Sequence, residues 1–132
     1  MGKLQIHEIP NKGDKRMTED KRGTIEKFRI EDFTGGWFIG NFEPSLLKTN
    51  DFEVSVKMHP AGQVWEKHYH KEATEYNYVF DGVVEIDGVE YVKGDVFVIH
   101  PDFVVDPNFK EDCTIMCVKT PCVIGDKYEI ER

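Results

Sequence analysis

Two histidines and one glutamate in the middle of the chain have the residue types and the spacing of a metal site. His68 and His70 are separated by one residue, so on a β-strand both imidazoles point to one face and can reach the same ion. Glu75 follows His70 by five residues. This odd offset would turn it to the other face of a continuous strand, so we expect a bend between Lys71 and Thr74. Two histidines and one carboxylate leave coordination positions open, as in non-haem iron sites.

The spacing around these residues resembles that of a known family. Five residues match every fixed position of the first signature motif of the cupin superfamily: Gly62, His68, His70, Glu75 and Gly82. The resemblance covers roughly Phe52 to Val118, about half of the chain. It implies a jelly-roll β-barrel, the double-stranded β-helix, with one divalent metal ion inside, held by the matching histidines and glutamate. Mixed nitrogen and oxygen ligands suit Fe, Mn, Ni or Zn.

The second cupin motif is only partly present. Gly94-Asp95 and the run Val96–Ile99 match its opening, after which the family has Pro-x-Gly and later a histidine ligand. An ungapped alignment puts Val105, which cannot bind a metal, at the ligand position. Shifting by one residue puts Asp106 there, and aspartate is a competent oxygen ligand. We therefore predict Asp106 as the fourth ligand. His100 competes for this role and for proton transfer, or is a strand-end histidine bonded to the backbone.

Short alternating or β-branched runs predict the strands that position these residues. They are Phe52–Met58, Tyr76–Phe80, Val83–Ile86, Val89–Val92, Val96–Ile99, Thr114–Lys119 and Tyr128–Glu131. Asp81-Gly82 and Asp87-Gly88 predict tight hairpin turns, because Asp-Gly accepts the positive φ of a type I′ turn. Helix signals are weak and confined to Ile25–Phe33 and Pro44–Leu47. The chain is therefore predicted to be all-β, a sandwich or a closed barrel that can hold one ligand.

The composition is that of one globular domain. The 132 residues carry 17 basic and 25 acidic side chains, a formal net charge of −8. Residues 1–30 are at +3 and residues 31–132 at −11. Phosphate contacts need clustered Lys and Arg, so the acidic body argues against nucleic acid or an anionic membrane as partner. No apolar run approaches the ~18 residues of a membrane span, and no signal peptide is evident, so we expect a cytoplasmic protein.

Two further divisions follow from composition. The stretch Asn11–Gly23 has almost no apolar side chain, so we assign residues 1–24 to a polar N-terminal arm and residues 25–132 to a single barrel domain. Three cysteines, an odd count, indicate reduced thiols that fill the core: Cys113, Cys117 and Cys122.

Strand alternation also orients the aromatic residues near the motif. Tyr69, between the two histidines, should point away from them, and Tyr76 and Tyr78 should face opposite Glu75. Asn77 shares the face of Glu75, where it either hydrogen-bonds a ligand or is a satisfied polar group of the barrel. The apolar segment Gly35–Asn41 has the character of an edge strand that packs or pairs with another chain, and we expect a homodimer.

Two functions of different class fit these features. The first is a metal-dependent enzyme that acts on a small polar metabolite, a sugar or an organic acid. The cupin resemblance implies dioxygenases, isomerases, epimerases, decarboxylases and lyases alike, and fold analogy alone does not choose the reaction. The second is a non-catalytic module that binds a sugar or another small molecule.

Overall fold

The structure, a computed structural model, describes residues 3–6 and 20–131 and is built almost entirely of β-strands. A five-stranded sheet has the order β3 (Trp37–Ile39), β4 (Glu53–His59), β11 (Cys113–Thr120), β6 (Thr74–Asp81) and β9 (Val96–Ile99). A three-stranded sheet has the order β10 (Asn108–Phe109), β7 (Val83–Ile86) and β8 (Val89–Val92). Two strand pairs complete the set: β12 (Tyr128–Glu129) with β5 (His68–Tyr69), and β1 (Lys3–Ile6) with β2 (Thr24–Lys27).

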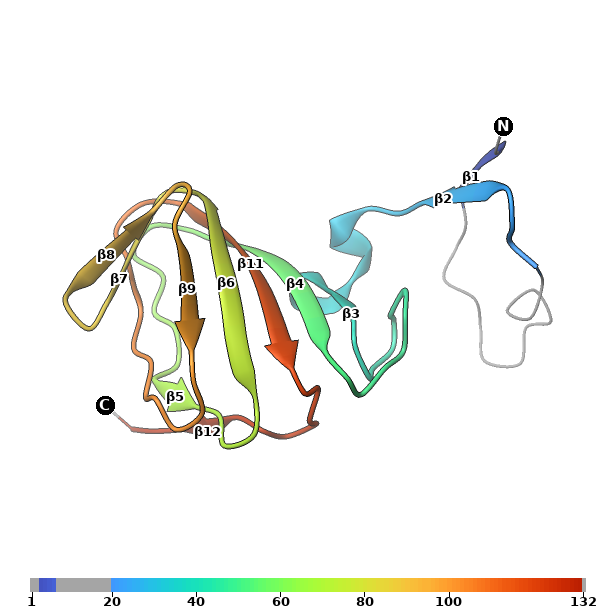
Figure 1. Ribbon diagram of the computed structural model, residues 1–132. Helices are drawn as coiled ribbons and strands as arrows, with labels where there is room; N and C mark the ends of the chain where they lie inside the picture. The colour runs from blue at the N-terminus through green and yellow to red at the C-terminus, as the bar shows by residue number, and fades with distance from the viewer. Residues whose placement is uncertain (1–2, 7–19, 132) are drawn as a thin grey trace.

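The two larger sheets enclose the core. β7 and β8 stand against one end of the five-stranded sheet, and β5 with β12 crosses the opposite end (Figure 1). Buried side chains from both sheets meet in one cluster: Val79, Val84, Ile86, Val105, Phe109, Cys113 and Ile115. Cys113, Cys117 and Cys122 are free, buried thiols, as expected for core residues. The prediction of an all-β chain is confirmed.

Two Asp-Gly pairs form different turns. Asp87 and Gly88, with φ of 53° and 81°, join the paired strands β7 and β8 as the expected type I′ hairpin. The hairpin predicted at Asp81-Gly82 is wrong, because β6 pairs with β11 and β9, whereas β7 lies in the other sheet. Gly82 therefore forms a corner between the sheets, and its α-carbon lies against the backbone of Asp112.

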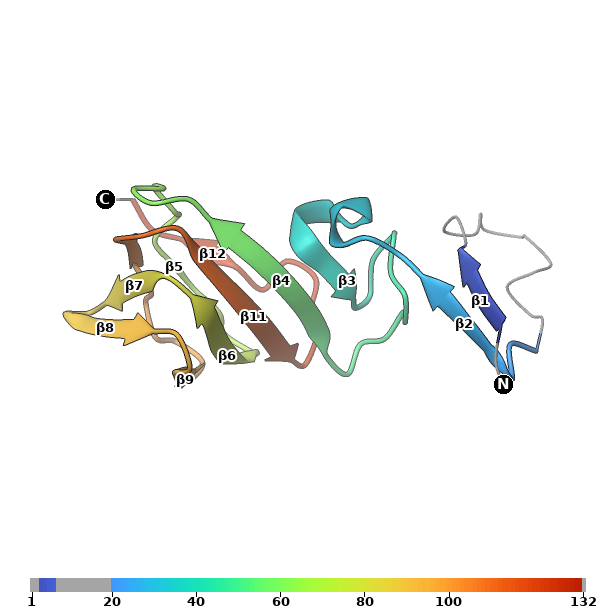
Figure 2. The same cartoon turned by 90° about the horizontal axis from the view of Figure 1, so that it is seen from above.

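The N-terminal part differs from the weak helix signals. The segment Ile25–Phe33 begins in β2, which pairs in parallel with β1, and continues into the 3-10 turn η2 (Ile30–Asp32). A second 3-10 turn, η3 (Thr34–Gly36), leads into β3, and Pro44–Leu47 contains no helix. Most of the predicted polar arm, residues 7–19, lies outside the described residues. β1 and β2 lie away from the two large sheets (Figure 2). In the described ranges, no helix is long and apolar enough to cross a membrane.

Apart from Asp81 at the end of β6, the outer face of the five-stranded sheet carries no charged side chain on its four longer strands. Its residues, all turned away from the core, are Val54, Val56, Met58, Thr74, Tyr76, Tyr78, Phe80, Val96, Val98, Thr114, Met116 and Val118. Val96 is 73% exposed and Tyr76 48% exposed. On an acidic chain, an uncharged apolar face is a surface where two copies can meet without charge repulsion.

We predict that this face forms the expected homodimer. Light scattering should give about twice the 15.3 kDa mass of one chain. Val96→Lys should then shift the protein to monomer, because it buries an unpaired charge in the contact. Val89→Lys, at another exposed position on β8 outside this face, is the control and should leave the mass unchanged. A monomeric wild-type protein would contradict the prediction.

A pair of glycines tests the corner between the sheets. Gly82→Ala and Gly88→Ala both place a side chain at positive φ, which costs about 1–2 kcal/mol. Only at Gly82 does a Cβ overlap the carbonyl oxygen of Asp112, whereas at Gly88 it meets open space. Chemical denaturation should therefore show Gly82→Ala to be less stable than Gly88→Ala by a further ~1–3 kcal/mol. Equal losses would mean that the corner yields without strain.

Candidate metal centre

A cavity of about 630 Å³ opens between the sheets, with the concave face of the five-stranded sheet as its floor. Strand register arranges this floor in rows. Glu53, Lys119 and Glu75 lie side by side on β4, β11 and β6, and the next row holds Ser55, Cys117 and Asn77. Lys57 and His59 continue along β4. All of these side chains line the cavity.

His70 and Glu75 face each other in this cavity. The Nε2 atom of His70 is 3.2 Å from Oε1 of Glu75, and the side chains are 5% and 13% exposed. The expected bend is present, because β5 ends at Tyr69 and β6 begins at Thr74. Glu75 thus reaches the histidines from a neighbouring strand, as predicted.

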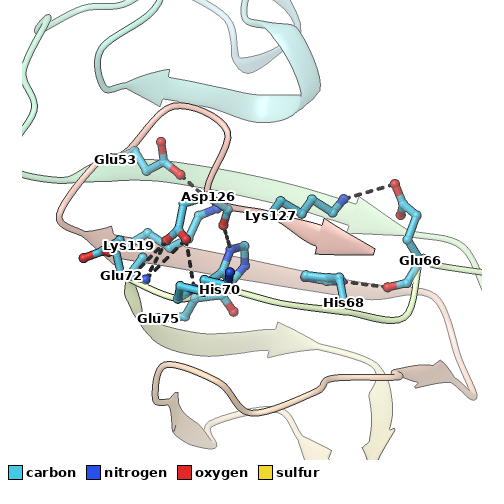
Figure 3. A network of polar contacts seen from close by, with 11 residues as sticks. Glu53, Glu66, His68, His70, Glu72, Glu75, Lys119, Asp126 and Lys127 are labelled. Carbon is cyan, nitrogen blue, oxygen red and sulfur yellow. Dashed lines mark hydrogen bonds and ion pairs between the residues drawn. The ribbon is translucent and has the colours of Figure 1, made fainter. Parts of the chain in front are cut away.

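Backbone carbonyls fix the ring nitrogens of both histidines. His68 Nδ1 donates to the carbonyl oxygen of Glu66 at 2.7 Å, and His70 Nδ1 donates to that of Asp126 (Figure 3). With Nδ1 protonated, Nε2 of each neutral ring carries a lone pair, which is the tautomer that metal-binding histidines use. His70 Nε2 is buried and has no hydrogen-bond partner assigned among the described residues. A lone pair and a carboxylate oxygen at this distance repel each other unless a proton or a metal cation lies between them.

Asp126 holds the turn that follows His70. Its carboxylate accepts hydrogen bonds from the backbone N–H groups of Lys71, Glu72 and Ala73 at 2.8–3.2 Å (Figure 3). Burial alone would raise the pKa of Asp126, but these three donors lower it below its usual value. One residue therefore clamps the turn with its side chain and orients His70 with its carbonyl.

Burial and charge act in opposite directions on Glu75. Desolvation would raise its pKa, but the contact with His70 and the positive charge of Lys119 lower it overall. Lys119 also pairs with Glu53 at 2.9 Å. The row of Glu53, Lys119 and Glu75 therefore holds two carboxylates and one ammonium group. Its net negative charge would partly neutralise a divalent cation bound there.

His68 lies beside His70 and Glu75, but its side chain does not converge with theirs on one point. Its ring centroid is 5.1 Å from that of His70, with the rings nearly perpendicular. As the side chains stand, no three His, Cys, Asp or Glu residues of the described ranges converge on one metal position. The residues able to hold a metal are His70 and Glu75, which face each other; His68 would join them only with its ring turned toward them.

Comparisons with known proteins agree with this architecture. No family model and no curated protein matches the sequence. Among solved structures, an uncharacterised protein with a double-stranded β-helix domain from Klebsiella pneumoniae has a TM-score of 0.57 at 21% identity, over 80% of this chain and 97% of that one. A protein with a cupin-like fold from Ralstonia eutropha has a TM-score of 0.55 at 13% identity, over 70% of this chain and 58% of that one. KdgF from Halomonas sp. has a TM-score of 0.50 at 22% identity, over 58% of this chain and 74% of that one.

The chain has the cupin fold. Within this fold, His68, His70 and Glu75 of the first motif all line the cavity. The alternation around them is as predicted: Asn77 is buried in the cavity, Tyr69 stacks outside on Tyr128, and Tyr76 is exposed.

The second motif departs from its expected role. Val105 pairs with His68 through two backbone hydrogen bonds and lines the cavity, so the ungapped alignment gives the correct register. Asp106, predicted as the fourth ligand, is exposed and is not among the residues lining the cavity. His100 is also exposed and away from the cavity. The structure therefore brings neither residue to the other three.

Several cavity residues went unnoticed in the sequence. His59 is 7% exposed, and its Nδ1 donates to Gln63 Oε1 at 2.7 Å while its ring stacks on Phe109. Burial lowers the pKa of His59. Alternation along Phe52–Met58 contained the signal for Ser55 and Lys57, which share a face with Glu53. Asp126 had no such signal, because its contacts are 53 to 56 residues away in the sequence.

Removing the charge of the Asp126 carboxylate should destabilise the protein in a pH-dependent way. Asp126→Asn weakens three backbone hydrogen bonds to a charged group, so we expect a loss of about 2–4 kcal/mol in the free energy of unfolding at neutral pH. Because the folded-state pKa is lowered, the contribution of Asp126 is present above its unfolded pKa, near 3.9, and is lost as pH falls further.

Urea denaturation of wild type and variant between pH 3 and pH 7 measures this difference. The two curves should approach each other at the acidic end. Asp112→Asn is a control, since Asp112 accepts one exposed backbone hydrogen bond, from Ala61. A constant gap over the whole range would contradict the assigned role of the carboxylate.

Proposed function

We propose that this cupin binds one divalent metal ion through His68, His70 and Glu75 and acts on a small polar molecule in the cavity. The observation that carries the proposal is the buried Nε2 of His70, which faces the Glu75 carboxylate while its Nδ1 is already engaged. Two ligands with bonds of ~2.1 Å to one ion lie about 3 Å apart at right angles, close to the spacing of this pair.

The side chains of this cupin have distinct roles in such a site. When bound, the metal would supply Lewis-acid polarisation of a substrate oxygen. Glu75, kept ionised by its neighbours, offers negative charge, and Asp126 keeps His70 in the ligand tautomer. The mixed donor set suits Fe, Mn, Ni or Zn. The apolar side chains Phe97, Ile99 and Val105 on the cavity wall limit the access of water.

Elemental analysis of the purified protein tests the metal. We expect about one metal ion per chain. His70→Ala should lower the affinity by more than the ~10–100-fold that loss of a supporting partner costs, and Glu75→Gln should act in the same direction. Asp106→Asn and His100→Ala are matched controls and should retain the ion. A protein purified without metal that also fails to bind added Fe, Mn, Ni or Zn would refute the proposal.

A measurement of substrate turnover distinguishes an enzyme from a non-catalytic binding module. The unpaired donors of the cavity floor would also suit a non-catalytic module that binds a sugar or another small molecule. Oxygen uptake with iron-loaded protein identifies a dioxygenase, and product analysis without oxygen identifies an isomerase or a lyase. A compound that raises the melting temperature and is never converted would favour the binding module.

A further inference from the structure

Two buried side chains on the cavity floor each have a polar atom without a hydrogen-bond partner in the described part of the chain. They are Ser55, which is fully buried, and Asn77, which is 8% exposed. The unpaired atoms are Ser55 Oγ and Asn77 Nδ2. A buried donor left unpaired is unfavourable, so native proteins rarely keep one without a use. Both residues line the same cavity, which points to a ligand that pairs with these atoms there.

Strand register places these two donors in one line. Ser55 on β4 lies opposite Cys117 on β11, and Cys117 lies opposite Asn77 on β6. Neighbouring strands are ~4.8 Å apart, so about 10 Å separates the backbones of Ser55 and Asn77. Burial raises the pKa of Cys117, so its thiol stays neutral. The row is therefore uncharged and rich in donors.

A lysine with no carboxylate partner stands beside this row. Lys57 lies two residues from Ser55 on the same face of β4, and its ammonium group donates to the carbonyl of Gly35 at 2.7 Å. The rings of Trp37 and Trp65 lie 5.2 and 5.6 Å from it. Within the described ranges no ion pair joins Lys57 to an acidic side chain.

The nearby carboxylates are engaged elsewhere. Glu53 pairs with Lys119 at 2.9 Å, and Glu66 pairs with Lys127 at 3.1 Å. An ammonium group has three donor hydrogens, and Lys57 uses one of them on a backbone carbonyl. Two remain for a ligand, in a half-buried position where a charge-assisted hydrogen bond is strong.

We propose that Lys57, Ser55 and Asn77 form a subsite for a small hydroxy- or keto-acid. The carboxylate of the ligand pairs with Lys57, and its other oxygens accept hydrogen bonds from Ser55 Oγ and Asn77 Nδ2. The opposite end of the ligand then points along β6 toward Glu75, two residues from Asn77. This subsite deepens the proposed function by naming the substrate class, but its donors are present without any metal.

A carboxylate fits these charges better than a phosphate. A phosphate monoester carries nearly two negative charges at neutral pH and is usually met by several cations or by a bidentate arginine. Here one unpaired ammonium faces the ligand, and Glu53 and Glu75 stand on the neighbouring row. A single negative charge balances Lys57 without repulsion from that row.

Calorimetry on metal-free protein, prepared with EDTA, tests the subsite. Three hydroxy acids of different length are each compared with an uncharged counterpart: gluconate with glucitol, malate with butanetriol, and glycolate with ethylene glycol. Glucose 6-phosphate is the phosphate probe. At least one acid should bind about tenfold or more tightly than its counterpart, and more tightly than the phosphate, because an ion pair replaces a neutral contact.

The variants separate a ligand role from a structural one. Lys57→Met should weaken binding of that acid about 10–100-fold, whereas Lys57→Arg should retain most of it. Lys93→Met, which removes an exposed lysine outside the cavity, is the control and should bind like wild type. Asn77→Leu and Ser55→Ala should also weaken binding, yet leave the melting temperature of the ligand-free protein unchanged or higher.

Three results would overturn the subsite: no acid binding better than its polyol, equal binding by wild type and Lys57→Met, or a preference for the phosphate. A lower melting temperature of ligand-free Asn77→Leu and Ser55→Ala with unchanged binding would assign these residues a structural role instead. The metal is absent from every measurement, so a failed metal analysis leaves this outcome unaffected. Conversely, a protein that binds metal but binds none of the carboxylates would refute the subsite and leave the proposed metal site standing.

Discussion

The candidate site depends on the double contact that Asp126 makes with the strand of the histidines. Its carboxylate binds three consecutive backbone N–H groups after His70, and its carbonyl takes the Nδ1 proton of His70 itself. The first contact sets the bend that turns the chain from β5 into β6. The second determines which ring nitrogen faces the cavity. Without both, the histidine and Glu75 would not present a lone pair and a carboxylate to the same point.

The register of the strands gives the cavity floor rows of side chains that differ in charge. One row across β4, β11 and β6 carries the charges of Glu53, Lys119 and Glu75, and the next row is neutral. In the row beyond it, Ile115 and Val79 are apolar, and Lys57 lies beside them on β4. Burial of a carboxylate such as Glu75 is tolerable only because cations lie next to it. Along the direction of the strands, the floor therefore changes from charged to neutral and then to apolar on β11 and β6, while β4 carries a second charge at Lys57.

Alternation and spacing in the sequence were sufficient for most strands of the two larger sheets and for three inward-facing site residues. Period two placed His68 and His70 on one face, and the odd step to Glu75 required the bend that the structure has. The same rule put Asn77 inside and Tyr76 outside. These successes share one property: each depends on residues within a few positions of one another.

The rest depended on contacts between distant segments, which a single sequence does not contain. Whether Val105 or Asp106 faces inward is decided by the bridge to His68, and a shift of one residue reverses the answer. Asp81-Gly82 has the composition of a hairpin, yet β6 finds other partners and the glycine becomes a corner. Asp126 gave no local signal because its partners lie more than fifty residues earlier.

The order of translation gives the Asp126 contact a further meaning. Both histidines and Glu75 are synthesised before β11 and Asp126, so until Asp126 is in place the ring of His70 has no fixed tautomer and the turn after it lacks its three side-chain hydrogen bonds. His68 differs, because the carbonyl that its ring binds belongs to Glu66, two residues earlier. The arrangement of His70 and Glu75 is therefore completed only at the end of folding, when the last segment of the chain closes over the first motif.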